Sequence, residues 1–273
     1  MGKRLFLIDG TALAYRSFFA FANNPRTNLT TSTGHPTSAT YGFLQTLRSL
    51  LDRESPDAIA ISFDGPSADL HRTDLYPEYK STREKMPDEM AMQLDDIREL
   101  VEAFGVEIVE ATKDEADDVI GTLAVAGRDA GMEVFIVTGD KDFLQLVDDR
   151  IRLWNLRSST TKPEILGPEE TLTKWGVATT QMIDLLALMG DSSDNIPGVP
   201  KIGQKTAVAL LQEYGNLDEL LVRRDEVKKP SIRKTLQENE DLARLSKQLV
   251  TIRLDLDLPI AAKDLQPARP DTE

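Results

Sequence analysis

The sequence predicts an α/β fold with a largely parallel central sheet flanked by helices, because short apolar runs alternate with helical patterns. Three runs read as buried strands, namely Arg4–Ile8, Ala58–Phe63 and Glu133–Thr138. Apolar residues recur at helical spacing between and after these runs, in Thr37–Glu54, Asp88–Phe104 and Glu115–Ala130. Ligands gather at the carboxyl ends of the strands in such folds, so the site is expected there.

The strand pattern ends near residue 165, which predicts a helical C-terminal subdomain. Its expected helices are Pro168–Trp175, Thr179–Met189, Lys205–Tyr214, Leu217–Val222 and Ser231–Leu249. We therefore place an α/β domain at residues 1–170, a helical subdomain at 171–260 and a flexible polar tail at 261–273.

Composition excludes several classes of protein. The chain has no cysteine and two histidines, so disulfides, zinc-thiolate sites, a cysteine nucleophile and a His-rich metal site are excluded. Any bound metal must use oxygen ligands. No apolar run approaches the roughly 18 residues that span a bilayer, and the N-terminus lacks an export signal. The net charge of −14 argues against nucleic acid as a partner, because phosphate binding needs Lys and Arg.

Acidic residues recur at the ends of the predicted elements, where they would face one crevice. The nine candidates are Asp9, Asp64, Glu115, Asp117, Asp118, Asp140, Asp142, Asp191 and Asp194. Each small group has an ordinary structural explanation, such as complementing a helix dipole or capping a turn. Nine carboxylates in one pocket would repel one another, however, unless cations were bound. Mg²⁺ and Mn²⁺ prefer oxygen ligands, and two ions about 4 Å apart can clamp a phosphodiester.

Six strings carry a family resemblance, in the family's order and from residue 5 to about 255. They are LFLIDGTALAYRSFFAF, TYGFLQTL, YPEYKSTREKMPDE, EADDVIGTLA, VTGDKDFLQLV and GDSSDNIPGVPKIGQKTA. The chain resembles the 5′ nuclease superfamily, in particular the 5′→3′ exonuclease domain of bacterial DNA polymerase I, which is related to phage 5′ nucleases and flap endonucleases. The resemblance implies a PIN-like 5′ nuclease fold, a helical arch around residues 70–90 and a C-terminal helix–three-turn–helix motif.

The resemblance also implies roles for the acidic residues. The first metal site would use Asp9, Asp64, Glu115 and Asp117, and the second would use Asp140, Asp142, Asp191 and Asp194. Asp117 or Asp118 would lie between the two ions. The implied cofactors are two Mg²⁺, with Mn²⁺ as a substitute. The implied activity is structure-specific 5′→3′ exonuclease and 5′-flap endonuclease cleavage of DNA, used in primer removal and repair.

Basic and aromatic residues of the arch supply the other implied catalytic groups. Lys80 and Arg83 are three residues apart, so on a helix they would share one face and could hold the scissile phosphate. Tyr79 beside them could stack on an unpaired base. An isolated pattern of this kind is usually only a solvated basic surface. Arg72 and Tyr76 are also expected to contact DNA, although His71 stands where the family commonly has an aromatic residue.

The segment from 195 to 207 resembles the helix–three-turn–helix, whose simplest structural explanation is a helix hairpin with glycine turns. Its expected DNA contacts are Gly198, Val199, Lys201, Ile202, Gly203, Gln204, Lys205 and Thr206. Glycine amides and a helix N-terminus bind phosphate rather than bases, so binding would be independent of sequence. The family often coordinates K⁺ through carbonyls in this loop. Position 201 is frequently Gly in the family and is Lys here.

The expected partner is DNA with 5′ ends or 5′ flaps, including flaps that carry an RNA primer. We expect a monomer in the bacterial cytoplasm, associated with the nucleoid and fused to or acting with a DNA polymerase. Two other classes compete: a non-catalytic nucleic-acid-binding module, which would lack several of these acids, and a magnesium phosphohydrolase of small molecules, which would need an Asp nucleophile or a phosphate loop. A short RNA-cleaving relative would carry fewer acids and no helical subdomain.

Overall fold

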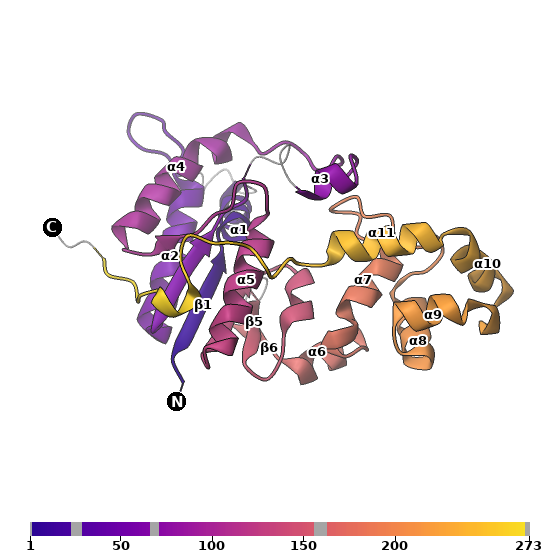
Figure 1. The fold of residues 1–273 in the computed structure, drawn as a ribbon. Coiled ribbons are helices and arrows are strands. Elements are labelled where there is room, and N and C mark those ends of the chain that lie inside the picture. The colour runs from indigo at the N-terminus through magenta and orange to yellow at the C-terminus, as the bar shows by residue number, and fades with distance from the viewer. Residues whose placement is uncertain (1, 23–28, 66–70, 156–162, 271–273) are drawn as a thin grey trace.

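The computed structural model describes residues 2–22, 29–65, 71–155 and 163–270, which form an α/β domain with a helical subdomain beside it (Figure 1). Within these residues the sheet has six strands in the order β3-β2-β1-β4-β5-β6. They are β1 Arg4–Asp9, β2 Ala58–Ser62, β3 Glu107–Ile108, β4 Glu133–Thr138, β5 Ile151–Asn155 and β6 Glu164–Leu166. All neighbours pair in parallel except β5 and β6. The predicted sheet is therefore confirmed.

The three strands predicted from the sequence form the centre of the sheet. β2 and β4 pair with β1 on its two sides, so their carboxyl ends meet at one edge. Nearly all their residues are buried, which is why they appear in the sequence as continuous apolar runs. The remaining strands lack such a run: β3 has two residues, and polar residues such as Arg152 and Glu164 interrupt β5 and β6.

Helices cover both faces of the sheet. Those of the α/β domain are α1 Gly10–Ala22, α2 Ser38–Glu54, α3 His71–Leu75, α4 Asp88–Ala103 and α5 Ala116–Asp129. Phe6 and Ile8 of β1 pack in one core cluster with residues of α1, α2 and α4. Leu5 and Leu7 point to the opposite face and pack with α5. The sequence pattern does not reveal α1, because its apolar residues are too numerous to mark one face.

The helical subdomain contains α6 Pro168–Trp175, α7 Met182–Met189, α8 Gln204–Tyr214, α9 Leu217–Val222, α10 Pro230–Glu238 and α11 Glu240–Val250. The prediction of one helix at Ser231–Leu249 is wrong, because the chain breaks at Asn239, whose backbone φ is −131°. The Asn239 side chain donates to the carbonyl of Thr235 at 2.8 Å, which ends α10. The break lets α11 pack along α7 (Figure 1).

The predicted helical arch is only partly helical in the described residues. Residue 70 lies outside them. From residue 71 the chain forms the short α3 and then a series of turns through residue 83. Lys80 itself has a backbone φ of 56°, which a helix does not allow. The prediction that Lys80 and Arg83 share a helix face is therefore wrong.

The predicted flexible tail packs onto the α/β domain as far as residue 268, so this prediction is wrong there. Ala262 and Leu265 are buried, and the carbonyl of Gln266 accepts a hydrogen bond from the amide of Ile59 at 3.1 Å. Ala268 also packs against the core of the α/β domain, so a few apolar side chains anchor this mostly polar segment. Residues 271–273 lie outside the described part. Among the described helices, none is both long and apolar enough to span a membrane.

Candidate active site

The three strand-end acids lie together because β2, β1 and β4 are neighbours in the sheet. Asp9 ends β1, and its carboxylate accepts hydrogen bonds from the amide of Ala12 and the hydroxyl of Thr138, both at 2.8 Å. The Thr138 hydroxyl also accepts from the amide of Asp140 at 3.0 Å. Asp64 follows β2, and its amide donates to the hydroxyl of Thr11 at 2.9 Å. The predicted grouping of these acids is confirmed.

The start of α5 brings further carboxylates to the same edge. The carboxylate of Asp64 accepts from the amide of Ala116 at 3.0 Å, so it lies at the N-terminus of α5. Glu115 precedes this helix and is only 2% exposed. Its Oε2 accepts from the hydroxyl of Tyr79 at 3.0 Å, and its Oε1 accepts from the Lys80 ammonium.

Burial and mutual repulsion raise the pKa values of two of these carboxylates, Asp9 and Asp117. Burial, followed by the negative charge of Asp64, raises the pKa of Asp9 to about 7, and Asp140 adds to the effect. The pKa of Asp117 is raised well above its usual range by burial and by the charges of Asp140, Asp9 and Asp64. These carboxylates therefore lie close enough to oppose one another's ionisation.

The Asp140–Asp142 turn adds the next members. Oδ1 of Asp140 accepts from the amide of Asp142 at 2.9 Å. Burial, followed by the charge of Asp140, raises the pKa of Asp142 to about 7 although the nearby Lys141 lowers it. The Lys141 ammonium forms ion pairs with Asp142 and Asp191. Burial tends to raise the pKa of Asp191, but the hydrogen bonds from Lys141 and Ser193 lower it overall.

Asp191 and Asp194 reach the site from a tight turn between α7 and α8. The turn is closed by two backbone hydrogen bonds between Asp191 and Ile196, at 2.8 and 2.9 Å. Asp194 is 8% exposed, and its Oδ1 accepts from the guanidinium of Arg83 at 2.5 and 3.1 Å. This turn carries two carboxylates to the site from the helical subdomain.

Lys80 links the arch segment both to Glu115 at the start of α5 and to Asp194 in the 191–194 turn. Its ammonium pairs with Glu115, while its amide donates to the carbonyl of Asp194 at 2.9 Å. This backbone hydrogen bond fixes Lys80 in a left-handed conformation, which costs a non-glycine residue about 1 kcal/mol or more. Such strain persists only where the surroundings enforce it, so the position of the Lys80 side chain is tightly set.

The donor set suits hard divalent cations. Every candidate ligand is a carboxylate oxygen, and Oδ1 of Asp142 is buried with no hydrogen bond, although the Lys141 ammonium lies 3.3 Å from it. Within the described residues, no three acidic or histidine side chains already converge on one point as a preformed metal cage. Instead, basic side chains pair with several of the carboxylates, so binding a divalent ion requires small rotations of the side chains. The chemistry of the residues fits Mg²⁺ or Mn²⁺.

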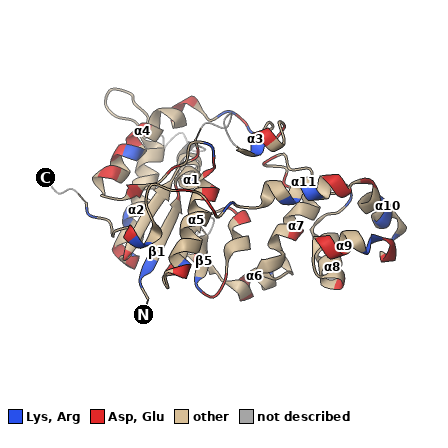
Figure 2. Ribbon diagram, in the orientation of Figure 1, with Lys and Arg blue, Asp and Glu red and all other residues tan. Residues whose placement is uncertain are grey.

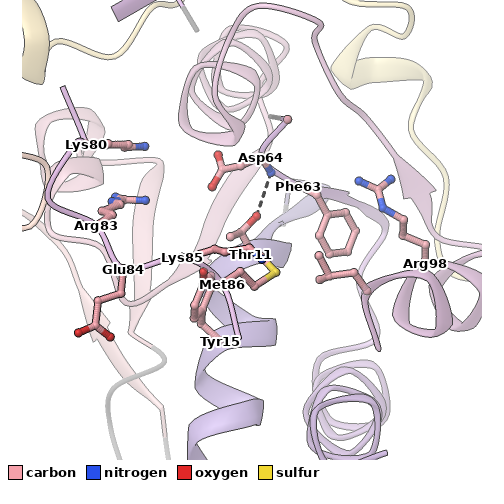
Figure 3. A pocket seen from close by; sticks show the side chains of 12 residues that line it. Thr11, Tyr15, Phe63, Asp64, Lys80, Arg83, Glu84, Lys85, Met86 and Arg98 are labelled. Carbon is pink, nitrogen blue, oxygen red and sulfur yellow. Dashed lines mark hydrogen bonds between the residues drawn. The ribbon is translucent and has the colours of Figure 1, made fainter. Parts of the chain in front are cut away.

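A cavity of about 370 Å³ opens beside Asp64. Figure 3 shows Lys80 and Arg83 on one side of it, extending toward Asp64, with Phe63 and Arg98 on the other side. The remaining lining residues include apolar and aromatic side chains from α1, the arch segment and α4, namely Tyr15, Met86 and Leu94. The cavity therefore combines a cationic wall with an apolar floor next to the carboxylates.

Two predicted site residues, Arg72 and Asp118, form an ion pair with each other. Arg72 is 5% exposed and forms a two-point ion pair with Asp118, at 2.6 and 2.8 Å. Asp118 is fully buried and accepts two more hydrogen bonds from backbone amides, those of Glu115 and Arg253. The predictions of Asp118 as a metal ligand and of Arg72 as a DNA contact are therefore wrong in this structure.

The two tyrosines of the arch segment differ. Tyr79 is 6% exposed, and its hydroxyl donates to Glu115 at 3.0 Å and lies 3.3 Å from Asp194. A buried ring cannot stack on an unpaired base, so that predicted role is wrong, and Tyr79 holds two carboxylates instead. Tyr76 is partly exposed and donates only to Glu78 at 3.0 Å, so its predicted contact with DNA stays a prediction.

The helix–three-turn–helix loop divides into a buried and an exposed part. Gly198, Val199 and Ile202 are buried. The amide of Gly198 donates to the hydroxyl of Ser246 at 3.0 Å, and a Cβ at this position would meet the amide of Gly190 at 2.4 Å. Gly198 is thus required for packing, and the structure contradicts its predicted amide contact with DNA; the side chains of Val199 and Ile202 are buried, so they cannot make the predicted contacts either.

The exposed part of the loop remains suited to phosphate. Gly203 precedes α8, whose first amides have no partner within the helix. Its neighbours Lys201, Gln204 and Lys205 are exposed and Thr206 is half-buried. Lys201 has a φ of 68°, a conformation that favours glycine, which explains the family's usual residue at this position.

Sequence reasoning missed several residues that organise the site. Thr11 and Thr138 fix the strand-end acids, Lys141 neutralises two carboxylates, and Gln145 bonds the turn that carries Asp142. Of these residues, only Lys141 could have been found from the sequence, since it lies between the predicted ligands Asp140 and Asp142. Tyr15, which lines the cavity, carries no signal beyond its aromatic ring.

Comparisons with known proteins agree on one family. The family described as 5′-3′ exonuclease, N-terminal resolvase-like domain, matches residues 4–176, and the 5′-3′ exonuclease, C-terminal SAM fold, matches residues 177–273. DNA polymerase I of Caldicellulosiruptor bescii is 40% identical over 265 residues, covering 96% of this chain and 30% of the relative. DNA polymerase I of Rhizobium leguminosarum is 42% identical over 275 residues, covering 97% of this chain and 26% of the relative.

Solved structures share the fold. A bacteriophage T5 D15 flap endonuclease complex with DNA and metal ions has a TM-score of 0.71 at 23% identity, covering 91% of this chain and 89% of that chain. The catalytic core of Rad2 in complex with DNA substrate has a TM-score of 0.62 at 19% identity, covering 99% of this chain and 84% of that chain. At such low identity these likenesses show the fold alone.

The matched domains together span residues 4–273, although the chain covers less than a third of the length of the polymerase I relatives. The fold, the carboxylate cluster and these matches show that the chain belongs to the 5′–3′ exonuclease family.

Proposed function

We propose that this chain is a divalent-metal-dependent 5′→3′ exodeoxyribonuclease and 5′-flap endonuclease. One observation carries the proposal: carboxylates from β1, β2, β4, the start of α5 and the 191–194 turn meet beside a wall formed by Lys80 and Arg83. Two magnesium ions held by these carboxylates would activate the attacking water and stabilise the leaving 3′ oxygen. No nucleophile from the protein is needed.

The proposed metal ligands are the acids that remain available after Asp118 is excluded. They are Asp9, Asp64, Glu115, Asp117, Asp140, Asp142, Asp191 and Asp194. The T5 5′-exonuclease binds divalent zinc ions, and the T5 D15 protein has been co-crystallised with metal ions, which supports metal dependence. Mn²⁺ is a suitable substitute because it accepts the same oxygen ligands.

Lys80 and Arg83 are the proposed phosphate-binding groups. Both extend into the cavity beside Asp64 (Figure 3), where a scissile phosphate next to the metal ions would lie within their reach. Their positive charges would hold the phosphate and neutralise the charge that develops on it during cleavage. Their pairing with Glu115 and Asp194 keeps both side chains in the site.

Duplex DNA is proposed to bind at the exposed part of the loop before α8. Lys201 and Lys205 flank the amides of the helix N-terminus, an arrangement that holds phosphate without reading bases. Potassium bound to carbonyls of this loop would add positive charge at the same place. A comparison of duplex affinity in K⁺ and in Na⁺ tests that part of the proposal.

The distribution of charge removes the objection raised by the net charge of −14. Figure 2 shows acidic residues along α4, where Asp88, Glu89 and Asp95 are among them, whereas basic and acidic residues are mixed around α10. Excess acid on the outer surface of the α/β domain does not oppose DNA held at the helical subdomain.

The proposed biological role is removal of primers and flaps during replication and repair. The relatives are bacterial DNA polymerase I, so we propose that the chain acts as a monomer in the cytoplasm, at the nucleoid, together with a polymerase activity. A non-catalytic binding module is disfavoured because the strand-end acids, Lys80 and Arg83 are all present and grouped.

The decisive experiment uses a 5′-labelled DNA flap on a nicked duplex. We expect cleavage near the junction in Mg²⁺, weaker release of single nucleotides from a recessed 5′ end, and no cleavage in EDTA. A flap with RNA at its 5′ end tests primer removal on the same gel. Cleavage that persists in EDTA, or no cleavage in either Mg²⁺ or Mn²⁺, would refute the proposed mechanism.

A further inference from the structure

The chain returns from the helical subdomain to the α/β domain through residues 249–253, the end of α11 and the coil after it, and two side chains join this return segment to the metal site. In Figure 1 it is the yellow coil that leaves α11 and runs past α5. Its backbone is held by side chains that lie next to proposed metal ligands. Both Arg72 and Gln145 contact it, from α3 and from the turn after β4 respectively.

Arg72 uses all five of its N–H donors within the protein. Its Nε donates to the carbonyl of Leu249 at 2.8 Å, and one terminal nitrogen donates to the carbonyl of Thr251 at 2.9 Å. The remaining donors bond Asp118 at 2.6 and 2.8 Å and Glu115 at 3.1 Å. Since a guanidinium has five donors, none remains for a phosphate.

Gln145 makes a similar connection on the other side of the segment. Its side-chain nitrogen donates to the carbonyl of Asp142 at 2.8 Å and to that of Val250 at 2.9 Å. Its side-chain oxygen accepts from the amide of Ile252 at 3.0 Å. One neutral side chain therefore joins the turn that carries Asp142 to the return segment.

We propose that Arg72 and Gln145 are positioning residues, which fix the metal-binding carboxylates Glu115 and Asp142 relative to the return segment of the helical subdomain. Neither residue touches substrate in this proposal. The consequence is that the metal site keeps its geometry only while the return segment, residues 249–253, stays in this position. The expected effect on cleavage rests on the proposed function. The expected effect on Mn²⁺ affinity is measured without DNA and does not need cleavage activity.

The direction of the expected effect separates positioning from a simple charge effect. Arg72→Gln removes a positive charge near the carboxylates, which by Coulomb's law alone would tighten metal binding. Loss of positioning predicts the opposite. We expect Mn²⁺ affinity, measured by titration calorimetry without DNA, to fall about tenfold or more, as for other residues that orient metal ligands.

A second readout separates positioning from DNA binding. A phosphate contact at Arg72 would make duplex binding weaker and lower its salt dependence by about one counterion. We expect duplex affinity and salt dependence in EDTA to match the wild type. On a flap substrate at fixed Mn²⁺, kcat should fall at least about tenfold while KM stays within about twofold.

Gln145→Ala and Arg244→Gln complete the design. Gln145→Ala does not change the charge, so a fall in Mn²⁺ affinity in this variant cannot come from charge. If Arg72→Gln does not fold, the Mn²⁺ affinity of Gln145→Ala alone tests the proposal. Arg244→Gln removes an equal charge from α11, where the side chain pairs with Asp218 and Glu240, and should leave Mn²⁺ affinity unchanged. Unchanged or tighter Mn²⁺ binding in folded Arg72→Gln, or unchanged binding in Gln145→Ala, overturns the proposal. A wild type that binds Mn²⁺ but cuts no flap refutes the proposed function instead.

Discussion

The acidic cluster consists of two groups that differ in their basic partners. Among the described residues, no ion pair is formed by the first group, which comprises Asp9, Asp64, Asp117 and Asp140. Every member of the second group has a basic partner: Glu115 has Arg72 and Lys80, Asp142 and Asp191 have Lys141, and Asp194 has Arg83. We call these the unpaired and the paired group.

The difference shows which charges the protein neutralises by itself. In the unpaired group the pKa values of Asp9 and Asp117 are raised by burial and by neighbouring carboxylates. In the paired group, the bond from Lys141 helps to lower the pKa of Asp191 despite burial, whereas burial and Asp140 raise that of Asp142 to about 7 although Lys141 opposes this. The unpaired group depends on an external cation, whereas a metal ion at the paired group competes with Lys80, Lys141 or Arg83. The two ions should therefore bind with unequal affinity.

The largest expected effect follows from removing a member of the unpaired group. Asp117→Asn deletes a carboxylate that no basic residue supports, so flap cleavage in Mg²⁺ should fall on the order of a thousandfold. Duplex binding through the loop before α8 should be retained. Single-turnover cleavage and binding in EDTA measure the two quantities.

Asp129→Asn, at the other end of α5, is the matched control and should cleave like the wild type. A loss of less than about tenfold in Asp117→Asn would mean that the unpaired group holds no catalytic ion.

The next effect concerns the cations of the paired group. Lys80→Ala and Arg83→Ala should each slow cleavage about a hundredfold, because each removes a charge aimed at the scissile phosphate. Duplex affinity should change much less. Lys85→Ala is the control, since Lys85 lines the same cavity but is almost fully exposed and pairs with Asp88. If affinity and rate fell equally, Lys80 and Arg83 would be binding residues only.

Three of the four members of the unpaired group could be predicted from the sequence because their geometry follows from the sheet. Asp9, Asp64 and Asp140 each follow a strand, and neighbouring parallel strands place such residues at one edge. The apolar runs therefore determine both the fold class and this part of the site. No long-range information about side chains is needed for that inference.

The partners of the paired group could not be predicted in the same way. Arg72 and Asp118 are 46 residues apart in the chain, and Arg72 and Leu249 are 177 apart. Their contacts depend on how α3, α5 and α11 pack, and a sequence motif does not state whether an arginine faces the interior or DNA. The same limit applies to Gly198, which packs against Gly190 and not against a phosphate.

A smaller effect tests the competition between protein cations and metal ions. Lys141→Met removes the ammonium that pairs with Asp142 and Asp191, so the weaker of the two Mn²⁺ binding steps should tighten about tenfold. Titration calorimetry resolves the two steps. Lys174→Met removes a surface ammonium that pairs with Glu164 and should change neither step. Weaker binding in Lys141→Met would show that Lys141 organises the second site instead of competing for it.

The smallest effect is on stability without metal, and its sign follows from the raised pKa values. Asp9 and Asp142 ionise near pH 3.8 when unfolded but near 7 when folded, so between these values the folded state binds more protons. The free energy of unfolding must then fall as pH rises through that window. In EDTA we expect a melting temperature a few degrees lower at about pH 8 than at about pH 5, with Mg²⁺ reversing the difference. Asp117→Asn relieves part of the repulsion and should reduce the pH dependence. A metal-free protein that is more stable at the higher pH would show that the protein's own cations already balance the unpaired group.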